Sequence, residues 1–269
     1  MNDWLDTCRL AVEDVRAVLA RLPARSDREP VVGDGEGGDE TTAIDAAVEQ
    51  AVVARLDASG LEFTLVSEEL GRRGDGSGAW VVLDPIDGSI NAKRGLPFFS
   101  LSIAVAEGGT MDDVVFGYVY DFGSGEEWTA ERGRGARLNG APLGPDLPKE
   151  TIELLIFEAT RTELVARHVP AFVGLAHRLR ILGSLAIALC HLADGRVDGV
   201  CSLKPARSVD IAAAQLLVRE RGLAIDLPDD PPLGSAALDL EGRSRVAAAG
   251  TPELCAQIGV ALSAAARPE

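Results

Sequence analysis

The chain has 269 residues, of which 46% are hydrophobic and 25% charged, a composition typical of a globular protein of one or two domains. No run of about 18 apolar residues occurs, and the acidic N-terminus lacks the basic and apolar regions of a secretory signal, so we predict neither a transmembrane helix nor export. The net charge of −16 makes nucleic acids and anionic membranes poor partners. We therefore expect a cytoplasmic protein with neither kind of partner.

The cations of this acidic chain are unusual, because Lys occurs only at positions 93, 149 and 204 and every other basic residue apart from His is Arg. High acidity, much Ala and few Lys are typical of proteins from salt-loving cytoplasms, where molar salt shortens the Debye length to about 3 Å. We predict a halophilic protein, although a GC-rich genome would give a similar bias. The four cysteines are scattered without a Cys-x-x-Cys pair, which indicates free thiols in a reducing compartment.

The first 60 residues predict two helices separated by a polar loop. Apolar residues at helical spacing predict helices over 3–22 and over about 41–59, and residues 23–40 form the loop. The loop contains a Gly-x-Gly-x-x-Gly sequence at 33–38. Its acidic residues would repel a pyrophosphate, and no strand and helix flank it in the required order, so we do not predict a dinucleotide site.

A turn in the next part of the chain carries two carboxylates. Residues 80–83 predict a buried strand that delivers Asp84 at its carboxyl end. Pro85 is expected to end the hydrogen-bonded ladder, and residues 87–89 are typical of a turn that starts a helix. A second core strand is predicted just after this turn. Polar residues between two core strands of an α/β protein lie where active sites usually form, although such residues are also common in surface turns.

The chemistry of this turn favours a metal and an anion together. Two carboxylates three residues apart, Asp84 and Asp87, would repel each other unless a divalent cation lay between them. Oxygen donors without nearby His or Cys favour a hard cation such as Mg²⁺. The backbone N–H groups of residues 88–90 could open a helix and receive a phosphate.

The pattern of elements changes near Pro148. Before it, a strand is predicted at 62–67, followed by a largely antiparallel run of strands at 98–106, 113–120 and 126–131, with a turn at 133–140. After it, strands alternate with helices, predicted as strands at 152–157, 180–182 and 197–203 and helices at 161–168, 170–178, 185–192, 208–220 and from 251. This order favours an α/β (α+β layered) fold.

Three segments in this order resemble the inositol monophosphatase superfamily. They are VSEELG at 66–71, DPIDGSIN at 84–91 and SVDIAAA at 208–214. The GLPFFSLSIAV continuation at 95–105 is similar to the archaeal branch. The resemblance implies Mg²⁺-dependent hydrolysis of small phosphomonoesters such as inositol phosphates and fructose 1,6-bisphosphate. It also implies an α-β-α-β-α sandwich, subdomains at 1–148 and 149–269 with the site between them, a glycine-rich flap at the 23–40 loop, and a homodimer.

The resemblance implies functional roles for several residues that their type and spacing alone would not identify as functional. It implies that Asp84 bridges two Mg²⁺ ions, that Ser89 orients the attacking water, and that Asp45 supports Ser89. Glu68 is preferred to Glu69 as a ligand, although paired acids after a strand normally face solvent. The remaining ligands are the Ile86 carbonyl, Asp87 and Asp210, and the substrate-binding candidates are Gly88, Ser89, Ser184, Lys204 and Arg207.

Two departures from the family pattern bear on the substrate. Leu203 stands where animal inositol phosphatases have a Glu that contacts an inositol hydroxyl, and residues 220–223 replace the usual acid-Ala-Gly-Gly. Because Lys204 and Arg207 follow Leu203, we predict a preference for fructose 1,6-bisphosphate over inositol 1-phosphate, although these cations could merely balance nearby acids. A nucleotide 3′-phosphatase of the same superfamily and a catalytically decayed binding module remain as alternatives.

Overall fold

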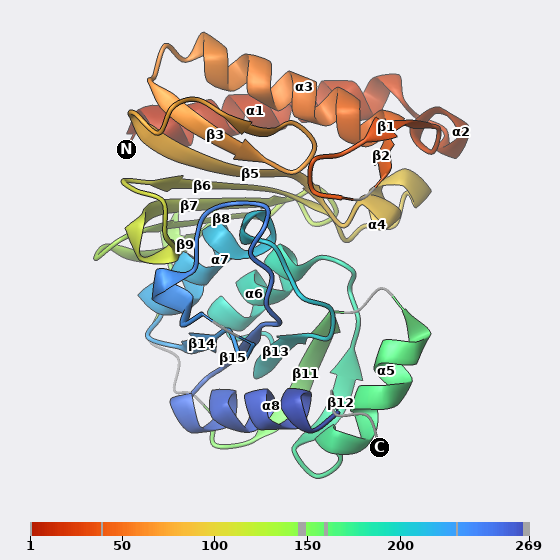
Figure 1. Cartoon of the computed structure of the whole chain (residues 1–269), viewed down its shortest axis with the longest axis vertical. Helices are drawn as coiled ribbons and strands as arrows, with labels where there is room; N and C mark the ends of the chain where they lie inside the picture. Colours follow the sequence, from red (N-terminus) through yellow and green to blue (C-terminus); the bar gives the residue numbers. More distant parts are fainter. Residues whose placement is uncertain (1, 39, 145–148, 159–160, 230, 266–269) are drawn as a thin grey trace.

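The computed structural model describes the chain except for residues 1, 39, 145–148, 159–160, 230 and 266–269. The predicted subdomain boundary at 148 lies outside the described residues. Helices and sheets alternate in five layers from the top to the bottom of Figure 1. The layers are α1 (Asn2–Arg21) with α3 (Ala43–Ala58), an eight-stranded sheet, α6 (Leu185–Ala193) with α7 (Ser208–Glu220), a five-stranded sheet, and α5 (Thr162–His168) with α8 (Pro252–Ala265). The predicted α-β-α-β-α sandwich is confirmed.

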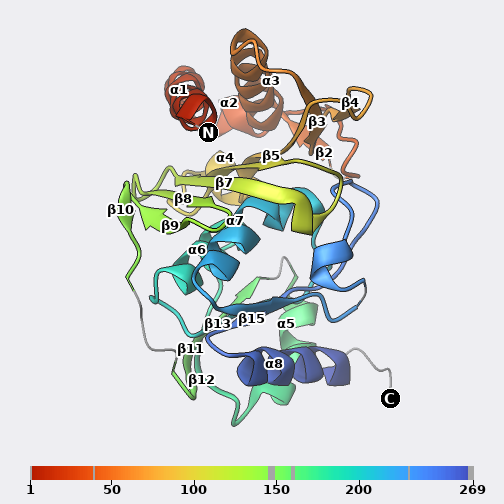
Figure 2. The same ribbon diagram turned by 90° about the vertical axis from the view of Figure 1, so that its left-hand side faces the viewer.

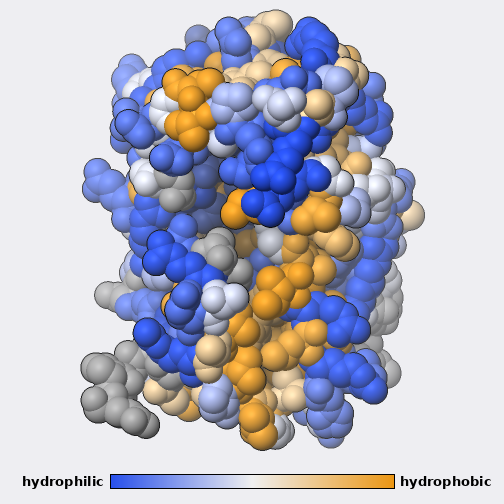
Figure 3. Space-filling view, turned by 90° about the vertical axis from the view of Figure 1, so that its right-hand side faces the viewer, coloured by the Kyte–Doolittle hydropathy of each residue, from blue (hydrophilic) through white to orange (hydrophobic). Residues whose placement is uncertain are grey.

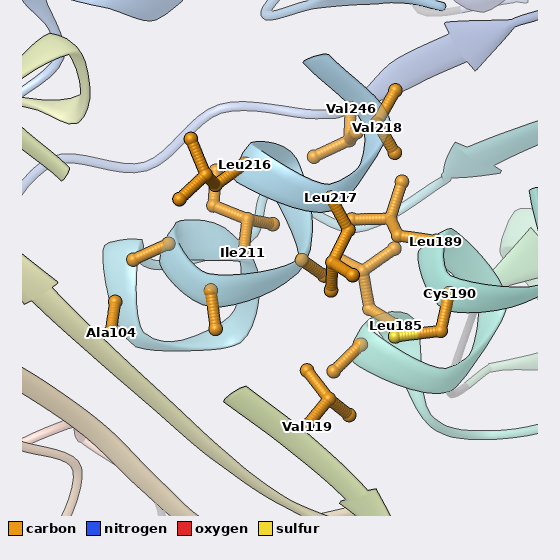
Figure 4. Packing of buried hydrophobic residues seen from close by; sticks show 14 of the residues in the cluster. Ala104, Val119, Leu185, Leu189, Cys190, Ile211, Leu216, Leu217, Val218 and Val246 are labelled. Carbon is orange, nitrogen blue, oxygen red and sulfur yellow. The ribbon is translucent and has the colours of Figure 1, made fainter. Parts of the chain in front are cut away.

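Figure 2 shows the same stacking of helices and sheets from the side, and three clusters of buried apolar residues hold these layers together. One lies between α1, α3 and the large sheet, and another lies between the small sheet and α8. The third surrounds α6 and α7, which face each other through Leu185, Leu189 and Leu217 (Figure 4). The two sheets cover α6 and α7 from both sides, so most of the residues around each helix are buried and apolar.

The large sheet has the order β10-β9-β8-β7-β6-β5-β3-β4, and all its neighbouring pairs except β3 and β5 are antiparallel. This confirms the predicted antiparallel run of strands. The strands are β3 (Phe63–Ser67), β4 (Gly71–Arg73), β5 (Ala79–Asp87), β6 (Ser100–Ala106), β7 (Val114–Asp121), β8 (Glu127–Glu131), β9 (Gly135–Leu138) and β10 (Ala141–Pro142). The segment 133–140, predicted as a turn, contains β9, because residues 135–138 pair with β8.

Pro85 does not end β5, contrary to the prediction. Asp84 pairs with Ser102 and Asp87 with Ser100, so β5 contributes one residue more than β6 between these pairs. This is a β-bulge, a place where a strand tolerates the missing N–H of proline. The strand therefore continues through the bulge to Asp87, and α4 (Ser89–Arg94) starts after Gly88.

The small sheet has the order β12-β11-β13-β15-β14, with β11 parallel to both of its neighbours. Its strands are β11 (Ile152–Glu158), β12 (Ala176–Arg180), β13 (Gly199–Ser202), β14 (Ala224–Asp226) and β15 (Ala247–Ala249). The predicted helix at 170–178 is wrong. A 3-10 turn, η2 (Val169–Phe172), ends before Gly174, which has a φ of 86°, and the chain then pairs with β11 as β12.

The predicted polar loop at 23–40 is partly ordered into a short helix and a hairpin. The helix is α2 (Arg25–Arg28), and the hairpin strands are β1 (Val31–Asp34) and β2 (Glu40–Thr42). Short 3-10 turns, η1 (Met111–Asp113) and η3 (Leu233–Ser235), contact each other beside the large sheet. None of the helices in the described ranges is long and apolar enough to cross a membrane. The four cysteines are free and buried.

Candidate active site

The bulge in β5 fixes Asp84 inside the molecule. Asp84 is 1% exposed, and its Oδ1 accepts a hydrogen bond from the Ile86 N–H at 3.0 Å. The Ser89 hydroxyl in turn donates to the Ile86 carbonyl at 3.1 Å. The bulge, its proline and the start of α4 therefore form one rigid turn.

Gly88 allows this turn to lie against the second half of the chain. Its φ is 98°, and a Cβ there would lie 2.7 Å from the Phe98 carbonyl oxygen and 3.0 Å from that of Gly183. No other residue type avoids both the left-handed strain and the contact. The Asn91 side-chain amide also bridges the halves, because it donates to the carbonyls of Phe98 and Leu182 at 2.7 Å each.

Asp87 also forms direct hydrogen bonds with the second half of the chain. Its Oδ2 accepts from the Ser184 hydroxyl at 2.6 Å and from the Ala186 N–H at 2.7 Å. Ser184 is also the N-cap of α6, since its Oγ accepts from the Ile187 N–H. Loss of solvation raises the pKa of Asp87 to about 6, although these hydrogen bonds oppose the rise. Ser184, predicted as a substrate-binding residue, thus positions Asp87 in this structure.

Strand pairing brings Glu68 to the same edge as Asp84, because it follows β3, the parallel neighbour of β5. A buried acid of α3 shapes this loop. Glu49 is 3% exposed, and its Oε1 accepts from the N–H groups of Glu69 and Leu70 at 3.1 Å each. Glu69 instead accepts a hydrogen bond from the Thr41 hydroxyl of β2. Glu68 and Glu69 therefore differ in role, with Glu68 directed to the acids of the turn.

The charges of four carboxylates act on one another at this place. Burial raises the pKa of Asp84 well above its ordinary value, and the charges of Glu68, Asp87 and Asp210 raise it further. Burial also raises the pKa of Glu68 to about 7, with Arg207 lowering it and Asp210 adding to the rise. Such mutual repulsion is relieved by a bound cation or by a basic side chain.

Arg207 supplies a basic side chain at this site. Its Nη2 lies 2.5 Å from Glu68 Oε1 and 3.0 Å from Asp210 Oδ1, and its own backbone N–H donates to Asp210 Oδ2 at 2.7 Å. Only 9% of Arg207 is exposed, whereas Lys204 is exposed and Leu203 is buried. The structure therefore places Arg207 on the site's acids.

Ser89 and Asp45, the predicted catalytic pair, make no direct hydrogen bond among the described residues. Ser89 donates to Ile86 as stated, and Asp45 Oδ2 accepts from the N–H and hydroxyl of Thr42 at 3.1 and 2.5 Å. Asp45 is nonetheless 4% exposed, and its Oδ1 is buried without a hydrogen-bond partner in the part of the chain that is described. A buried carboxylate oxygen in that state has the capacity to accept a hydrogen bond from a bound molecule.

The donor chemistry at the turn fits a hard divalent cation. The groups are carboxylates and a backbone carbonyl, which are the oxygen ligands that Mg²⁺ prefers. Within the described ranges, no three Asp, Glu, His or Cys side chains lie close enough together to hold a metal ion. Arg207 separates Glu68 and Asp210, which accounts for part of this spacing.

The hairpin β1–β2 lies over Glu68 and is tied down at its tip. The N–H of Gly37 donates to the Glu68 carbonyl at 2.8 Å, and that of Glu36 to the Glu69 carbonyl at 3.1 Å. Arg243, from the second half, donates to the Gly37 carbonyl at 2.6 Å. Sequence reasoning missed Arg243, because nothing local marks its partner.

Glu158 was also missed in the sequence. It ends β11, is 8% exposed, and accepts from the N–H groups of Leu182 and Gly183 at 3.2 and 3.0 Å. It thereby supports the loop that presents Ser184 to Asp87. Burial and the charge of Asp87 raise its pKa to about 8. The available signal was an acid at the end of an apolar strand, the same feature that marked Asp84.

Comparison with known proteins agrees with this arrangement. The profile of the inositol monophosphatase family matches residues 6–263. A fructose-1,6-bisphosphatase/inositol-1-monophosphatase of Methanothermobacter thermautotrophicus is 32% identical over 267 residues, covering 93% of each chain. The Nus factor SuhB of Pasteurella multocida is 36% identical over 230 residues, covering 82% of this chain and 84% of that protein.

The fold is shared with solved structures as well. A crystal structure of an inositol monophosphatase-fructose 1,6 bisphosphatase superposes with a TM-score of 0.83 at 27% identity, and the match covers 96% of this chain and 99% of that one. The family and the layered fold expected from the three sequence motifs agree with these matches. The chain therefore belongs to the inositol monophosphatase family and is a phosphoric monoester hydrolase.

Proposed function

We propose that the protein is a Mg²⁺-dependent phosphatase of small sugar or polyol phosphates, acting on fructose 1,6-bisphosphate and inositol 1-phosphate in the cytoplasm. The observation that carries this proposal is that Glu68, Asp84 and Asp87 from one half lie near Asp210 from the other, so that the charges of the other three acids raise the pKa of the buried Asp84. The relatives named fructose-1,6-bisphosphatase/inositol-1-monophosphatase support the substrate class.

In this proposal the four carboxylates and the Ile86 carbonyl hold Mg²⁺. Bound Mg²⁺ would lower the pKa of water and offset negative charge on the reacting phosphate. The N–H groups of Gly88 and Ser89 would orient the phosphate at the start of α4, because the turn is held rigid by the Asp84 and Ile86 bonds.

Ser89 and Asp45 are proposed to orient the attacking water and accept its proton. The Ser89 hydroxyl already donates to Ile86, so its lone pairs remain to accept a hydrogen bond from water. The buried Asp45 Oδ1 has acceptor capacity left among the described residues. The missing direct bond between the pair is consistent with a water placed between them.

Substrate preference is proposed to come from the segment around Leu203. This apolar side chain is 2% exposed and cannot bind a sugar hydroxyl, while Lys204 beside it is exposed and can reach a second phosphate. Arg207 would add to that role only after leaving Glu68 and Asp210. We expect kcat/KM to be higher for fructose 1,6-bisphosphate than for inositol 1-phosphate.

The test is phosphate release by the purified protein with Mg²⁺, from each of these substrates and from adenosine 3′,5′-bisphosphate. Lys204→Gln should weaken only the fructose bisphosphate reaction, by about tenfold for one charge-assisted hydrogen bond. Lys149→Gln is the control, because Lys149 is an exposed lysine whose ion pairs with Glu153 and Asp198 involve none of the proposed site residues. Hydrolysis of inositol 1-phosphate alone refutes the preference, and a preference for the nucleotide supports the 3′-phosphatase alternative.

A binding role without catalysis is the second candidate, favoured by the similarity to proteins named Nus factor SuhB. The full set of acids argues against decay of the site, because carboxylates that hold no cation would cost stability in burial. Complete absence of Mg²⁺-dependent phosphate release would favour this candidate over the phosphatase.

We also propose a homodimer through an apolar face. Figure 3 shows an apolar band down the side that carries α4, β12 and α5. Large exposed apolar residues in and next to these elements are Ile90, Leu96, Phe98, Val173 and Ile181. A contiguous exposed patch of this kind is typical of an interaction site. Sedimentation analysis of Phe98→Glu against the unmodified protein tests it, since a monomeric wild type rules the dimer out.

A further inference from the structure

The Arg207 guanidinium occupies the position between two proposed metal ligands. Its Nη2 bridges Glu68 Oε1 and Asp210 Oδ1, at 2.5 and 3.0 Å, and its Nε lies 3.4 Å from Asp210 Oδ2. The ion pairs are largely buried, with 10% of the Arg207 side chain exposed, against 13% for Glu68 and 15% for Asp210. Buried pairs of this kind are strong because little solvent screens them.

A metal ion and this guanidinium need the same oxygen atoms. Mg²⁺ binds carboxylate oxygens at about 2.0–2.1 Å and demands near-octahedral geometry. The lone pairs that would bind the ion are those that now accept hydrogen bonds from Arg207, and the two cations would also repel each other. Coordination by both Glu68 and Asp210 therefore requires that Arg207 leaves at least one of them.

The hairpin packs directly on this ion pair. A Cβ on Gly37 would lie 2.6 Å from Arg207 Nη1 and 3.0 Å from the Glu68 carbonyl oxygen, so a side chain at this position would push against the guanidinium. The same residue accepts the hydrogen bond from Arg243. The structure thus builds a covered position for the guanidinium.

We propose that Arg207 is an internal counter-ion that competes with the metal for Glu68 and Asp210. It stabilises the buried acids when no metal is bound, and it moves off them when a divalent cation binds. This inference rests on the proposed function for its assignment of the ligands. It adds that the chain's own cation sets the affinity of the site for metal.

The test compares Arg207→Met with the unmodified full chain after treatment with EDTA, titrating Mg²⁺ alone by calorimetry. Met keeps the unbranched apolar stem of the side chain and removes the guanidinium, and the backbone N–H of residue 207 that donates to Asp210 remains. Removal of the competing cation should tighten Mg²⁺ binding by about tenfold or more, the value of one hydrogen bond between charged groups. Arg219→Met is the control, because Arg219 is on the same helix and pairs with the exposed Asp112, and its Mg²⁺ affinity should not change.

Thermal unfolding gives a second measure. Arg207→Met should lower Tm in EDTA, where the acids lose their counter-ion, and most of this loss should disappear in saturating Mg²⁺, because tighter metal binding stabilises the folded state. A structural role alone would give an equal loss in both conditions. Equal losses, or Mg²⁺ affinity that is unchanged or weaker in Arg207→Met, overturn the proposal.

Arg207→Lys decides the matter if the Met variant does not fold in EDTA. A single ammonium cannot match the planar fork that bridges both acids, so Mg²⁺ should bind this variant more tightly than wild type, by a smaller factor. Unchanged or weaker binding refutes the competition. Failure of the wild-type protein itself to bind Mg²⁺ or release phosphate would instead refute the proposed function, so the two failures are distinct.

Discussion

Two acidic segments of this protein, the turn at 84–89 and the hairpin at 31–42, have opposite physical designs. The turn lies at the end of β5, where residues 81–86 are buried. Backbone N–H groups and a hydroxyl donate hydrogen bonds to its acids. The hairpin has a fully exposed β1, and its acids Asp34, Glu36 and Glu40 face solvent. Acids that bind an ion need fixed positions and little contact with solvent. Acids on a hairpin that covers a site, here called the cover, need neither.

The largest expected effect comes from the turn itself. Asp84→Asn keeps the shape of the side chain but removes the charge that the proposed metal site shares, so phosphatase activity should fall below detection while the fold is retained. Initial rates with fructose 1,6-bisphosphate and circular dichroism measure both. Asp57→Asn, on an exposed pair with Arg73, is the control. Near-normal turnover by Asp84→Asn would remove this turn from the active site.

Ser89→Ala tests whether the turn also orients water. Loss of the hydroxyl should lower kcat by about 10²-fold, the usual contribution of a positioned proton-transfer group, with a smaller effect on KM. Steady-state kinetics beside Ser263→Ala, an exposed serine of α8, provide the comparison. An unchanged kcat would exclude Ser89 from the mechanism.

Arg243→Met tests the cover. It removes the hydrogen bond to the Gly37 carbonyl and loosens the hairpin without touching the turn. We expect kcat/KM to fall only about fivefold, since one such bond is worth about 1 kcal/mol. Arg134→Met serves as the control, because Arg134 is exposed and its ion pair with Glu131 lies at the surface. A loss as large as that of Asp84→Asn would contradict the distinction between turn and cover.

Glu158→Gln tests the support of the turn through pH. Burial raises the folded-state pKa of Glu158 from 4.5 to about 8, so its neutral form is favoured, and the stability it contributes is lost as pH rises from 4.5 to 8. Gln stays neutral at every pH, so the Tm of the variant, measured in EDTA, should rise relative to that of the wild type across this range. Each kcal/mol corresponds to about 2–4 °C. A difference as flat as that of the exposed Glu163→Gln would contradict the assignment.

Salt should give the smallest and most distributed effect. If the surface acids, including those of the hairpin, reflect adaptation to salt, Tm should rise by a few degrees as KCl increases from about 0.1 M to molar concentration, because screening weakens their repulsion. The buried acids of the turn are screened much less. A flat or falling profile would support the compositional explanation of the charge.

Local chemistry determined much of this protein from the sequence. The spacing of apolar residues in α1, α3 and α7, and the start of a helix after Asp87, depend on neighbours within a few residues, whereas the bulge at Pro85 depends on pairing with β6 and was not predicted. The motifs at 66–71, 84–91 and 208–214 likewise gave the family and its layers, which the comparisons confirm. The predicted roles of individual site residues remain predictions.

The tertiary structure decided what depends on partners distant along the chain. Residues 176–180 form a strand because β11 offers them a parallel edge, which outweighs their helical pattern. The pairing of Arg207 with Glu68, the support of Ser184 by Glu158 and the tether of Gly37 by Arg243 all join segments that no local signal connects. Side-chain chemistry in the sequence singled out Asp84 and Asp87, and the family resemblance added Glu68 and Asp210. Only the packing of the two halves placed Arg207 between Glu68 and Asp210.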